Sequence, residues 1–333
     1  MRASVPVRVA DVGGWTDTWF GSPGRVCSLA VGPGVVVDAS VVTGRSPGAA
    51  LVRLIASVDD TSLLDHAVDA VVEDLDLTSM LEDGDGIDVT ISSSVPPGAS
   101  LGTSASVVVG VLGALDSLVG GGARLSADLA VLAHEVEVTR AGREAGVQDQ
   151  WAAALGGAGL MAIAPYPTVR HERLAVPHAA LHEIGSRLVT VVFGPHDSSA
   201  VHGEVINAMV GCGGEVHDRA RRALAHLSAL AGDAAEALLA GDVERWAAVL
   251  TASTEGQAAL HTGLVGRAHR EAIDLASAHG ASGWKVNGAG GEGGSLTVVA
   301  SPQPGAVERL ASALDRGGWQ VVDLAPAVGL VLA

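Results

Sequence analysis

A glycine-containing loop between a predicted strand and a predicted helix is the segment best suited to chemistry. It spans 95–106, reads VPPGASLGTSAS, and follows an alternating strand pattern over 86–92. Small residues let backbone N–H groups approach an anion, and the N-terminus of the following helix adds partial positive charge without a basic side chain. The segment, called the phosphate loop below, matches neither G-x-x-x-x-G-K-S/T nor G-x-G-x-x-G. Its spacing alone leaves two interpretations open, a phosphate-binding loop or an ordinary helix N-terminus.

Two further segments, one near each end of the chain, have a similar character. Residues 8–18 read RVADVGGWTDT, and residues 285–294, called the glycine loop below, read KVNGAGGEGG. The glycine loop begins with Lys285, the only lysine among the 20 basic residues of the chain. Lysine and arginine are not interchangeable in a tight site, so this lysine is either functional or retained by chance. The four glycines after Gly288 exceed what one hairpin needs, and we expect the glycine loop to pack against the phosphate loop.

These three segments, in this order, resemble the motifs of the GHMP kinases, the family of galactokinase, homoserine kinase and mevalonate kinase. The resemblance spans nearly the whole chain. It implies an α+β two-domain fold, with a ribosomal-protein-S5-domain-2-like domain over 1–170 and a ferredoxin-like domain over 171–333, and an active site between the two domains. It implies ATP and Mg²⁺ as cofactors. The nucleotide-binding residues that it implies are Pro97, Gly98, Ala99, Ser100, Leu101, Gly102, Thr103 and Ser104, and those of the structural glycine loop are Gly288, Gly290 and Gly291.

A fourth segment, 146–157 with the sequence GVQDQWAAALGG, is similar to a region of the sugar 1-kinases within that family. There the aspartate is the catalytic base, which implies this role for Asp149. Phosphoryl transfer needs a carboxylate that accepts the hydroxyl proton. By the same resemblance Arg8 lies near Asp149 and stabilises the charge that moves to the acceptor oxygen. Without the resemblance, Asp149 would be a carboxylate on a helix surface and Arg8 a solvent-facing residue at a strand start.

The resemblance also assigns residues to the acceptor and to the metal ion. The acceptor would contact Asp149 and the first segment; an Asx turn is the alternative for its Asp17. Mg²⁺ takes few protein ligands besides phosphate oxygens, and the matching hydroxyl and carboxylate are Ser104 and Glu137. Glu135 competes with Glu137 for the metal, and either could be a plain helix-face carboxylate. The acceptor residues of the first segment are Gly14, Trp15, Thr16 and Asp17.

The acceptor itself is left open by two branches of the family. The stretch GGWTDT most resembles the L-fucokinases, whereas the chain length and the QDQ stretch resemble the D-glycero-D-manno-heptose 7-phosphate kinases. We expect an ATP-dependent kinase that phosphorylates a sugar hydroxyl, the anomeric one; the alternatives are a heptose 7-phosphate kinase, a non-sugar GHMP enzyme and an ATP-binding pseudokinase. A phosphorylated acceptor would need a cationic pocket, and we favour a neutral sugar. The candidates for such a pocket are Arg140, Arg143, His196 and His202.

Some residues depart from the family pattern. Ser100 stands where a glycine is commoner, and Glu292 interrupts the small residues of the glycine loop. Residues 19–20, Trp-Phe, replace a proline pair that commonly follows the TDT stretch. These departures put phosphate contact by Glu292 in doubt and leave the acceptor unidentified.

Composition limits the classes of partner. A net charge of −17 opposes binding to nucleic acid or to an anionic membrane, so the expected partner is a small sugar or sugar phosphate. The start of the chain has no cationic region followed by an apolar stretch, and we expect a cytoplasmic protein for which a homodimer is left open. Cys27 and Cys212 lack metal-ligand spacing and are expected to be buried free thiols.

Hydrophobic periodicity predicts alternating strands and helices in the first half and an α+β sandwich in the second. A boundary is expected within 165–177. The predicted strands are 5–12, 26–31, 35–42, 86–92, 159–164, 187–193, 283–287 and 295–300. The predicted helices are 62–75, 103–118, 126–140, 147–155 and 305–316, together with a helical tract over 200–279 that breaks near residues 232, 241 and 262.

Overall fold

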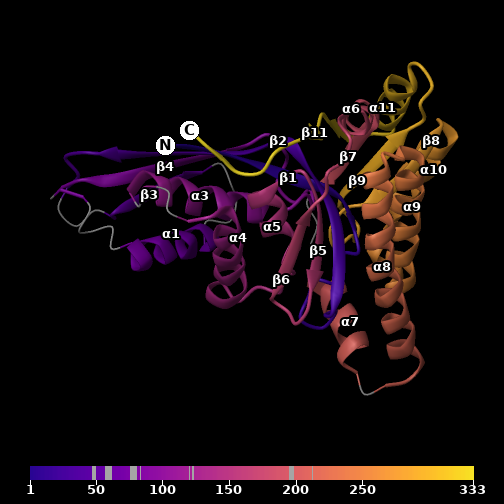
Figure 1. The fold of residues 1–333 in the computed structure, drawn as a ribbon, viewed down its shortest axis with the longest axis horizontal. Helices are drawn as coiled ribbons and strands as arrows, with labels where there is room; N and C mark the ends of the chain where they lie inside the picture. Colours follow the sequence, from indigo (N-terminus) through magenta and orange to yellow (C-terminus); the bar gives the residue numbers. More distant parts are fainter. Residues whose placement is uncertain are drawn as a thin grey trace.

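The computed structural model describes residues 1–46, 50–56, 62–75, 81–82, 84–119, 121, 124–194, 199–211 and 213–333. Within them, eight strands form a first sheet and four form a second, antiparallel sheet (Figure 1). Helices cover both sheets, so the predicted α+β class is confirmed. His196 and Cys212 lie outside the described residues.

The first sheet has the strand order β12-β1-β2-β4-β3, and β5, paired to β2, adds β6. Among the described strands of this sheet, only β3 and β4 pair in parallel, and α1 connects them. The strands are β1 (Arg2–Val12), β2 (Gly24–Val42), β3 (Val52–Ala56), β4 (Gly86–Ser93), β5 (Ala158–Ile163) and β6 (Val169–Arg173), with β11 (Ala325–Pro326) and β12 (Val331–Leu332) from the end of the chain.

Helices α1 (Ser62–Leu75), α3 (Thr103–Val119), α4 (Ser126–Glu135) and α5 (Gln148–Leu155) pack on one face of this sheet (Figure 1). Apolar residues occur nearly all round α3, which predicted a buried helix, and residues 105–116 of α3 are buried. The core is aliphatic because aromatic residues make up only 3% of the chain. This layer fixes the start of α3, and with it the phosphate loop.

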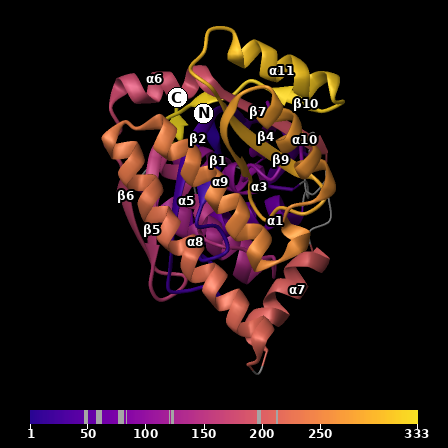
Figure 2. The same cartoon turned by 90° about the vertical axis from the view of Figure 1, so that its right-hand side faces the viewer.

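The second sheet has the order β10-β7-β9-β8, with β7 (Leu188–Gly194), β8 (Ala281–Val286), β9 (Gly294–Ala300) and β10 (Gln320–Val322). Helices α10 (Arg267–Ala278) and α11 (Ala306–Arg316) bury their apolar faces against it. The long helices α8 (Glu215–Ala240) and α9 (Val243–Leu260) run side by side (Figure 2), and α6 (His178–Arg187) and α7 (Ser199–Val210) flank them.

The two halves of the chain share one hydrophobic core. Val9 and Leu29 of the first sheet pack in one cluster with Ala231 of α8 and Trp246 of α9. The last strands of the chain, β11 and β12, return to pair with β2 and β1. Residue 170 lies inside β6, which pairs with β5, so the first sheet extends beyond the expected boundary. The division into 1–170 and 171–333 stays a prediction.

Three predicted boundaries were wrong for identifiable reasons. Residues 26–42 form one strand, because β2 continues through its Gly-Pro-Gly segment with a shift of register against β1. The helix expected over 126–140 changes at Val136 into a π-helical turn, Val136–Arg140. Helix α8 continues through Gly232. The missing side chain leaves room for Arg25, because a Cβ at this position would lie 3.2 Å from Nη1 of Arg25.

Helix α8 is long and apolar enough to span a membrane, but half of its most apolar window is buried inside the protein. It packs against α9 and β2, and we interpret it as a core helix. Cys27 is buried, as expected, and burial raises the pKa of its thiol to about 12.

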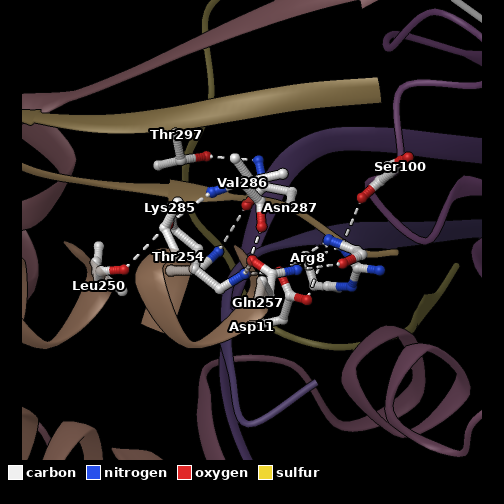
Figure 3. A network of polar contacts seen from close by, with 12 residues as sticks. Arg8, Asp11, Ser100, Leu250, Thr254, Gln257, Lys285, Val286, Asn287 and Thr297 are labelled. Atoms are coloured by element: carbon white, nitrogen blue, oxygen red, sulfur yellow. Dashed lines mark hydrogen bonds and ion pairs between the residues drawn. The ribbon is translucent and has the colours of Figure 1, made fainter. Parts of the chain in front are cut away.

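A buried polar network joins the two halves (Figure 3). The Lys285 ammonium donates to Oε1 of Gln257 at 2.7 Å and to the carbonyl of Val286, and it lies 3.9 Å from Oδ1 of Asp11. Asp11 is fully buried and accepts hydrogen bonds from the backbone N–H of Gly288 at 3.0 and 3.1 Å. Because buried polar groups must be paired, these contacts fix the glycine loop against β1.

Asn287 adds a second link between the halves. Its Oδ1 accepts a hydrogen bond from Ala10 N at 3.1 Å, and its amide donates to the hydroxyls of Ser295 and Thr297. The side chain is fully buried, so these bonds are shielded from water. The glycine loop is therefore held at residues 285, 287 and 288.

We predict that Lys285 makes stability rise with pH in the alkaline range. Burial lowers the pKa of Lys285 from 10.5 to about 8, and the Asp11 charge only partly offsets this. Between these values the unfolded chain binds the proton that the folded chain has released, so the free energy of unfolding increases with pH. Relative to Lys285→Met, the wild type should gain about 2 kcal/mol between about pH 8 and pH 10 in denaturant titrations. If the free energy of unfolding changes with pH in the same way in the two proteins, the pKa of Lys285 is not lowered by burial.

Candidate active site

A cavity of about 200 Å³ lies where the first segment, α5, α7 and the glycine loop meet. It brings together residues that are far apart in the sequence. Three of the four segments singled out from the sequence contribute to its wall, and the phosphate loop adjoins it through Gly102, as shown below. The lining residues are Arg8, Trp15, Asp17, Thr18, Phe20, Glu137, Glu144, Ala145, Gly146, Gln148, Asp149, Gln150, His202, Ile206, Gly288 and Ala289.

Arg8 and Asp149 form a bidentate ion pair at the floor of the cavity. Nε of Arg8 lies 2.8 Å from Oδ1 of Asp149, and Nη2 lies 3.2 Å from Oδ2. The third nitrogen, Nη1, donates to the carbonyl of Ser100 at 2.6 Å. Burial alone would lower the pKa of Arg8, but the charges of Asp149 and Asp11 raise it overall, so the guanidinium stays protonated. The interpretation of Arg8 as a solvent-facing residue was wrong, since only 4% of it is exposed.

The phosphate loop has the backbone of an anion-binding nest. Left-handed residues alternate along it, with φ of 71° at Gly98, 55° at Ser100 and 72° at Gly102. Such alternation turns successive N–H groups toward one side. Serine rarely adopts a positive φ, which explains why glycine is the commoner residue at position 100. The side chains of Ala99 and Leu101 are buried in the core, so only their backbone is available to a ligand.

The phosphate loop adjoins the ion pair. A Cβ on Gly102 would lie 3.2 Å from Cγ of Asp149 and 3.4 Å from Cγ of Arg8. The loop is also tied to β1, because Arg8 N donates to the carbonyl of Leu101 at 2.9 Å. An anion held by the N-terminus of α3 would therefore lie next to the Asp149 carboxylate.

The glycine loop lies against the phosphate loop at one residue. A Cβ on Gly288 would lie 3.0 Å from the carbonyl oxygen of Ser100. Gly290 and Gly291 instead pack on Leu264: a Cβ on Gly290 would lie 2.0 Å from its oxygen, and Gly291 N donates to it. The Glu292 carboxylate accepts a hydrogen bond from Arg267 N at 3.2 Å and does not line the described cavity.

Trp15 lines the cavity beside His202 of α7, and Asp17 lines it beside the start of α5. The Asp17 carboxylate accepts a hydrogen bond from Gln148 N at 3.1 Å, which joins it to the start of α5. Burial, with a contribution from the Asp149 charge, raises the pKa of Asp17 to about 6. Glycine is required at 146, because a Cβ there would lie 2.0 Å from the Asp17 carboxylate. The Trp15 ring packs edge-on against His202, with ring centroids 4.7 Å apart.

Two residues predicted to contact the acceptor are not among the described residues that line the cavity. The Thr16 hydroxyl donates to the carbonyl of Gly13 at 2.7 Å and accepts from Arg25 N at 3.1 Å. A Cβ on Gly14 would lie 3.0 Å from the Asp11 carboxylate, so this glycine admits Asp11. Both residues shape the turn that carries Trp15 and Asp17.

Glu137 lines the cavity, and Glu135 does not. Glu137 lies in the π-helical turn, a feature that often marks functional sites, and accepts a hydrogen bond from the Gln150 amide at 2.6 Å. Burial and the Asp149 charge raise its pKa to about 6. Glu135 is exposed and lies 3.7 Å from Arg140.

The donors suit Mg²⁺ bound mainly by phosphate oxygens. Glu137 offers a carboxylate, and Ser104, exposed in the first turn of α3, offers a hydroxyl. Among the described residues, no group of three or more His, Cys, Asp or Glu side chains could hold a metal ion. An all-oxygen pair without a protein cage fits a metal ion that arrives with a nucleotide.

Sequence reasoning missed the residues that support these groups. Gln150 was visible as part of the QDQ stretch, but nothing in the sequence indicated its bond to Glu137. The Tyr166 hydroxyl contacts Nε2 of His134 at 2.8 Å and donates to the carbonyl of Ala145 at 3.1 Å, which holds the cavity wall. Asp11, inside the first segment, is the carboxylate shared by Arg8 and Gly288.

We predict that Asp17→Asn stabilises the protein near neutral pH. Because the pKa of Asp17 is raised from 3.8 to about 6, the folded chain binds more protons than the unfolded chain between these values, and wild-type stability falls as pH rises through them. Asparagine removes the buried charge and can still accept from Gln148 N. The variant should gain about 1–3 kcal/mol at about pH 7.5 and almost nothing below about pH 4 in thermal unfolding. Asp38→Asn, at an exposed carboxylate, is the control; equal effects of the two substitutions would contradict the burial of Asp17.

Known proteins match this chain at two levels. A family model described as the GHMP kinases N terminal domain matches residues 62–157. The mevalonate kinase of Thermococcus onnurineus is 37% identical over 97 residues, 29% of this chain and 27% of the relative. That of Pyrococcus horikoshii is 43% identical over 81 residues, 23% of each chain. The matched segments therefore span about a quarter of these curated relatives.

Solved structures match over the full length. A D-glycero-D-manno-heptose 1-phosphate kinase from Bacteroides thetaiotaomicron has a TM-score of 0.72 at 22% identity and covers 100% of this chain and 99% of its own. The galactokinase of Lactococcus lactis, solved with galactose, has a TM-score of 0.74 at 15% identity, covering 99% and 94%. At these identities the structures show the fold, and the family model adds the sequence match. Residues 62–157 therefore match the N-terminal domain of the GHMP kinases, and the whole chain has the fold of the heptose kinase and galactokinase structures.

Proposed function

We propose that this chain is an ATP-dependent kinase that transfers the γ-phosphate to a sugar hydroxyl. The observation that carries the proposal is the convergence of a phosphate-binding loop, a carboxylate held by a buried arginine and a small polar cavity. The first holds an anion, the second accepts a proton, and the third holds an acceptor. Phosphoryl transfer depends on positioning these three elements and on neutralising the charge of the transferring group.

Asp149 is the proposed general base. Its carboxylate lines the cavity and is 29% exposed, so an acceptor hydroxyl can reach it. The two bonds from Arg8 fix the plane of the carboxylate before the acceptor binds, which lowers the cost of reaching the reactive geometry. Asp149 takes the hydroxyl proton as the acceptor oxygen attacks the γ-phosphorus.

Charge on the transferring group is balanced by backbone dipoles and by Arg8. The N–H groups of the phosphate loop and the N-terminus of α3 bind the triphosphate without a lysine. Arg8 lies beside both the loop and Asp149, where it stabilises the charge that moves toward the acceptor oxygen. A protein of net charge −17 can bind a nucleotide in this way.

Glu137 and Ser104 are the proposed contacts of Mg²⁺. Bound with ATP, the ion would neutralise phosphate charge. The pKa of Glu137, raised to about 6, applies to the protein without a bound metal ion.

The proposed acceptor is a sugar, phosphorylated at its anomeric hydroxyl. The GGWTDT and QDQ stretches support it, because their Trp15, Asp17, Asp149 and Gln150 all line the cavity. Coupled release of ADP over a panel of free sugars, sugar phosphates and mevalonate would separate a sugar kinase from a non-sugar enzyme. ATP binding without turnover on any of these acceptors would indicate a pseudokinase.

We predict that Asp149→Asn lowers kcat by about 10² or more and leaves ATP affinity in calorimetry nearly unchanged. The substitution keeps the shape of the side chain and removes the proton acceptor. Asp38→Asn, remote from the cavity, should keep wild-type kcat. Near-normal turnover in Asp149→Asn would exclude this residue as the base.

A further inference from the structure

We infer that the acceptor bound by this cavity carries no phosphate group, and that Glu144 at the mouth of the cavity helps to reject phosphorylated sugars. The inference rests on the proposed function and specifies its substrate class. It is carried by the charges of the lining residues and by an aromatic rim.

The charges of the cavity wall are mostly negative. Asp17, Glu137, Glu144 and Asp149 contribute carboxylates, whereas Arg8 is the only Arg or Lys among the described lining residues. All three nitrogens of the Arg8 guanidinium already bond to Asp149 or to the Ser100 carbonyl. The Arg8 guanidinium is therefore committed to the floor of the cavity, where the γ-phosphate is expected.

Among the described residues, the cationic candidates Arg140, Arg143 and His202 do not form a phosphate pocket at the mouth. Arg140 lies 2.8 Å from the Glu73 carboxylate and 3.7 Å from that of Glu135. Arg143 lies near Glu137, where its charge only partly offsets the rise in the Glu137 pKa, and it is not among the described lining residues. His202 packs edge-on against Trp15.

An aromatic rim adjoins the cavity instead: Trp15 and Phe20 line it, and the exposed Trp19 packs against Phe20 outside the described lining. The chain has only six Trp, two Phe and one Tyr, yet Trp15, Trp19 and Phe20 lie within six positions of one another. The Phe20 ring contacts both tryptophans, with centroids 6.3 and 5.4 Å apart. Nε1 of Trp19 donates to Oε2 of Glu144 at 2.8 Å, which holds this carboxylate at the mouth. Aromatic faces suit the C–H face of a neutral sugar, and a fixed carboxylate beside them repels a phosphate dianion.

The test compares matched acceptors that differ only in a remote phosphate. Galactose with galactose 6-phosphate, mannose with mannose 6-phosphate, and sedoheptulose with sedoheptulose 7-phosphate are supplied with Mg²⁺ and ATP, and kcat/KM is measured for each. We expect the accepted sugar to exceed its phosphate by at least about 100-fold. Equal or better use of a phosphorylated sugar would overturn the inference and leave the kinase proposal intact. Failure of every acceptor, with ATP still bound in calorimetry, would overturn the sugar kinase proposal and with it the inference.

Glu144→Gln tests the residue itself. This substitution removes the charge and keeps an oxygen that can accept a hydrogen bond from Trp19. The ratio of kcat/KM for the neutral sugar to kcat/KM for its phosphate should fall by about 10-fold, mainly through a lower KM for the phosphorylated sugar. Glu236→Gln is the matched control, because Glu236 is an exposed carboxylate that pairs with Arg245 and is not among the described lining residues. If this ratio is unchanged in Glu144→Gln, or falls equally in Glu236→Gln, then Glu144 is not the residue that rejects phosphorylated sugars.

Discussion

The buried guanidinium of Arg8 is the interaction on which the rest of the site depends. A buried cation needs close anionic partners, because isolated charges are costly away from water. Arg8 finds Asp149 on α5, Asp11 on its own strand and the carbonyl of Ser100 in the phosphate loop. Asp11 in turn accepts from Gly288 and lies 3.9 Å from Lys285. One side chain thereby fixes the positions of the base, the phosphate loop and the glycine loop.

Small residues make this convergence possible. A Cβ at Gly102, Gly146 or Gly288 would come within 3.2 Å of a neighbouring group of the site. A core built from alanine, valine, leucine and glycine lets the backbone segments approach closely, so backbone N–H groups supply the positive potential that an acidic chain lacks in its side chains. The small-residue composition of the chain thus accounts for the way in which the site would bind an anion.

Local patterns predicted much of the fold, and the misses have physical causes. Helix α1 has the predicted bounds, 62–75, and α3 extends one residue beyond its predicted end, because apolar periodicity and caps are local signals. The break expected at Gly232 was wrong because a glycine inside a helix can be kept for a tertiary contact, here with Arg25. The return of β11 and β12 to the first sheet depends on pairing across the whole chain, which no local pattern encodes.

The site was predictable as a set of segments and not as a network. Resemblance to known motifs named Arg8, Asp17, Glu137 and Asp149, and the structure brings all four to one cavity. It could not separate Thr16, which supports a turn, from its neighbours Trp15 and Asp17, which line the cavity. Nor could it give Lys285 its partners, since Asp11 and Gln257 lie far from it in the sequence. Such pairings follow from the folded arrangement alone.

The most direct test of the account is the fate of the γ-phosphate. Wild-type protein is incubated with Mg²⁺, free sugars and ATP labelled at the γ-phosphate, and the products are separated and identified by ³¹P NMR. We predict that label appears on the anomeric oxygen of a sugar, with one ADP released for each sugar phosphate formed. Label found only in ATP and inorganic phosphate, although the protein is folded and binds ATP, would contradict it.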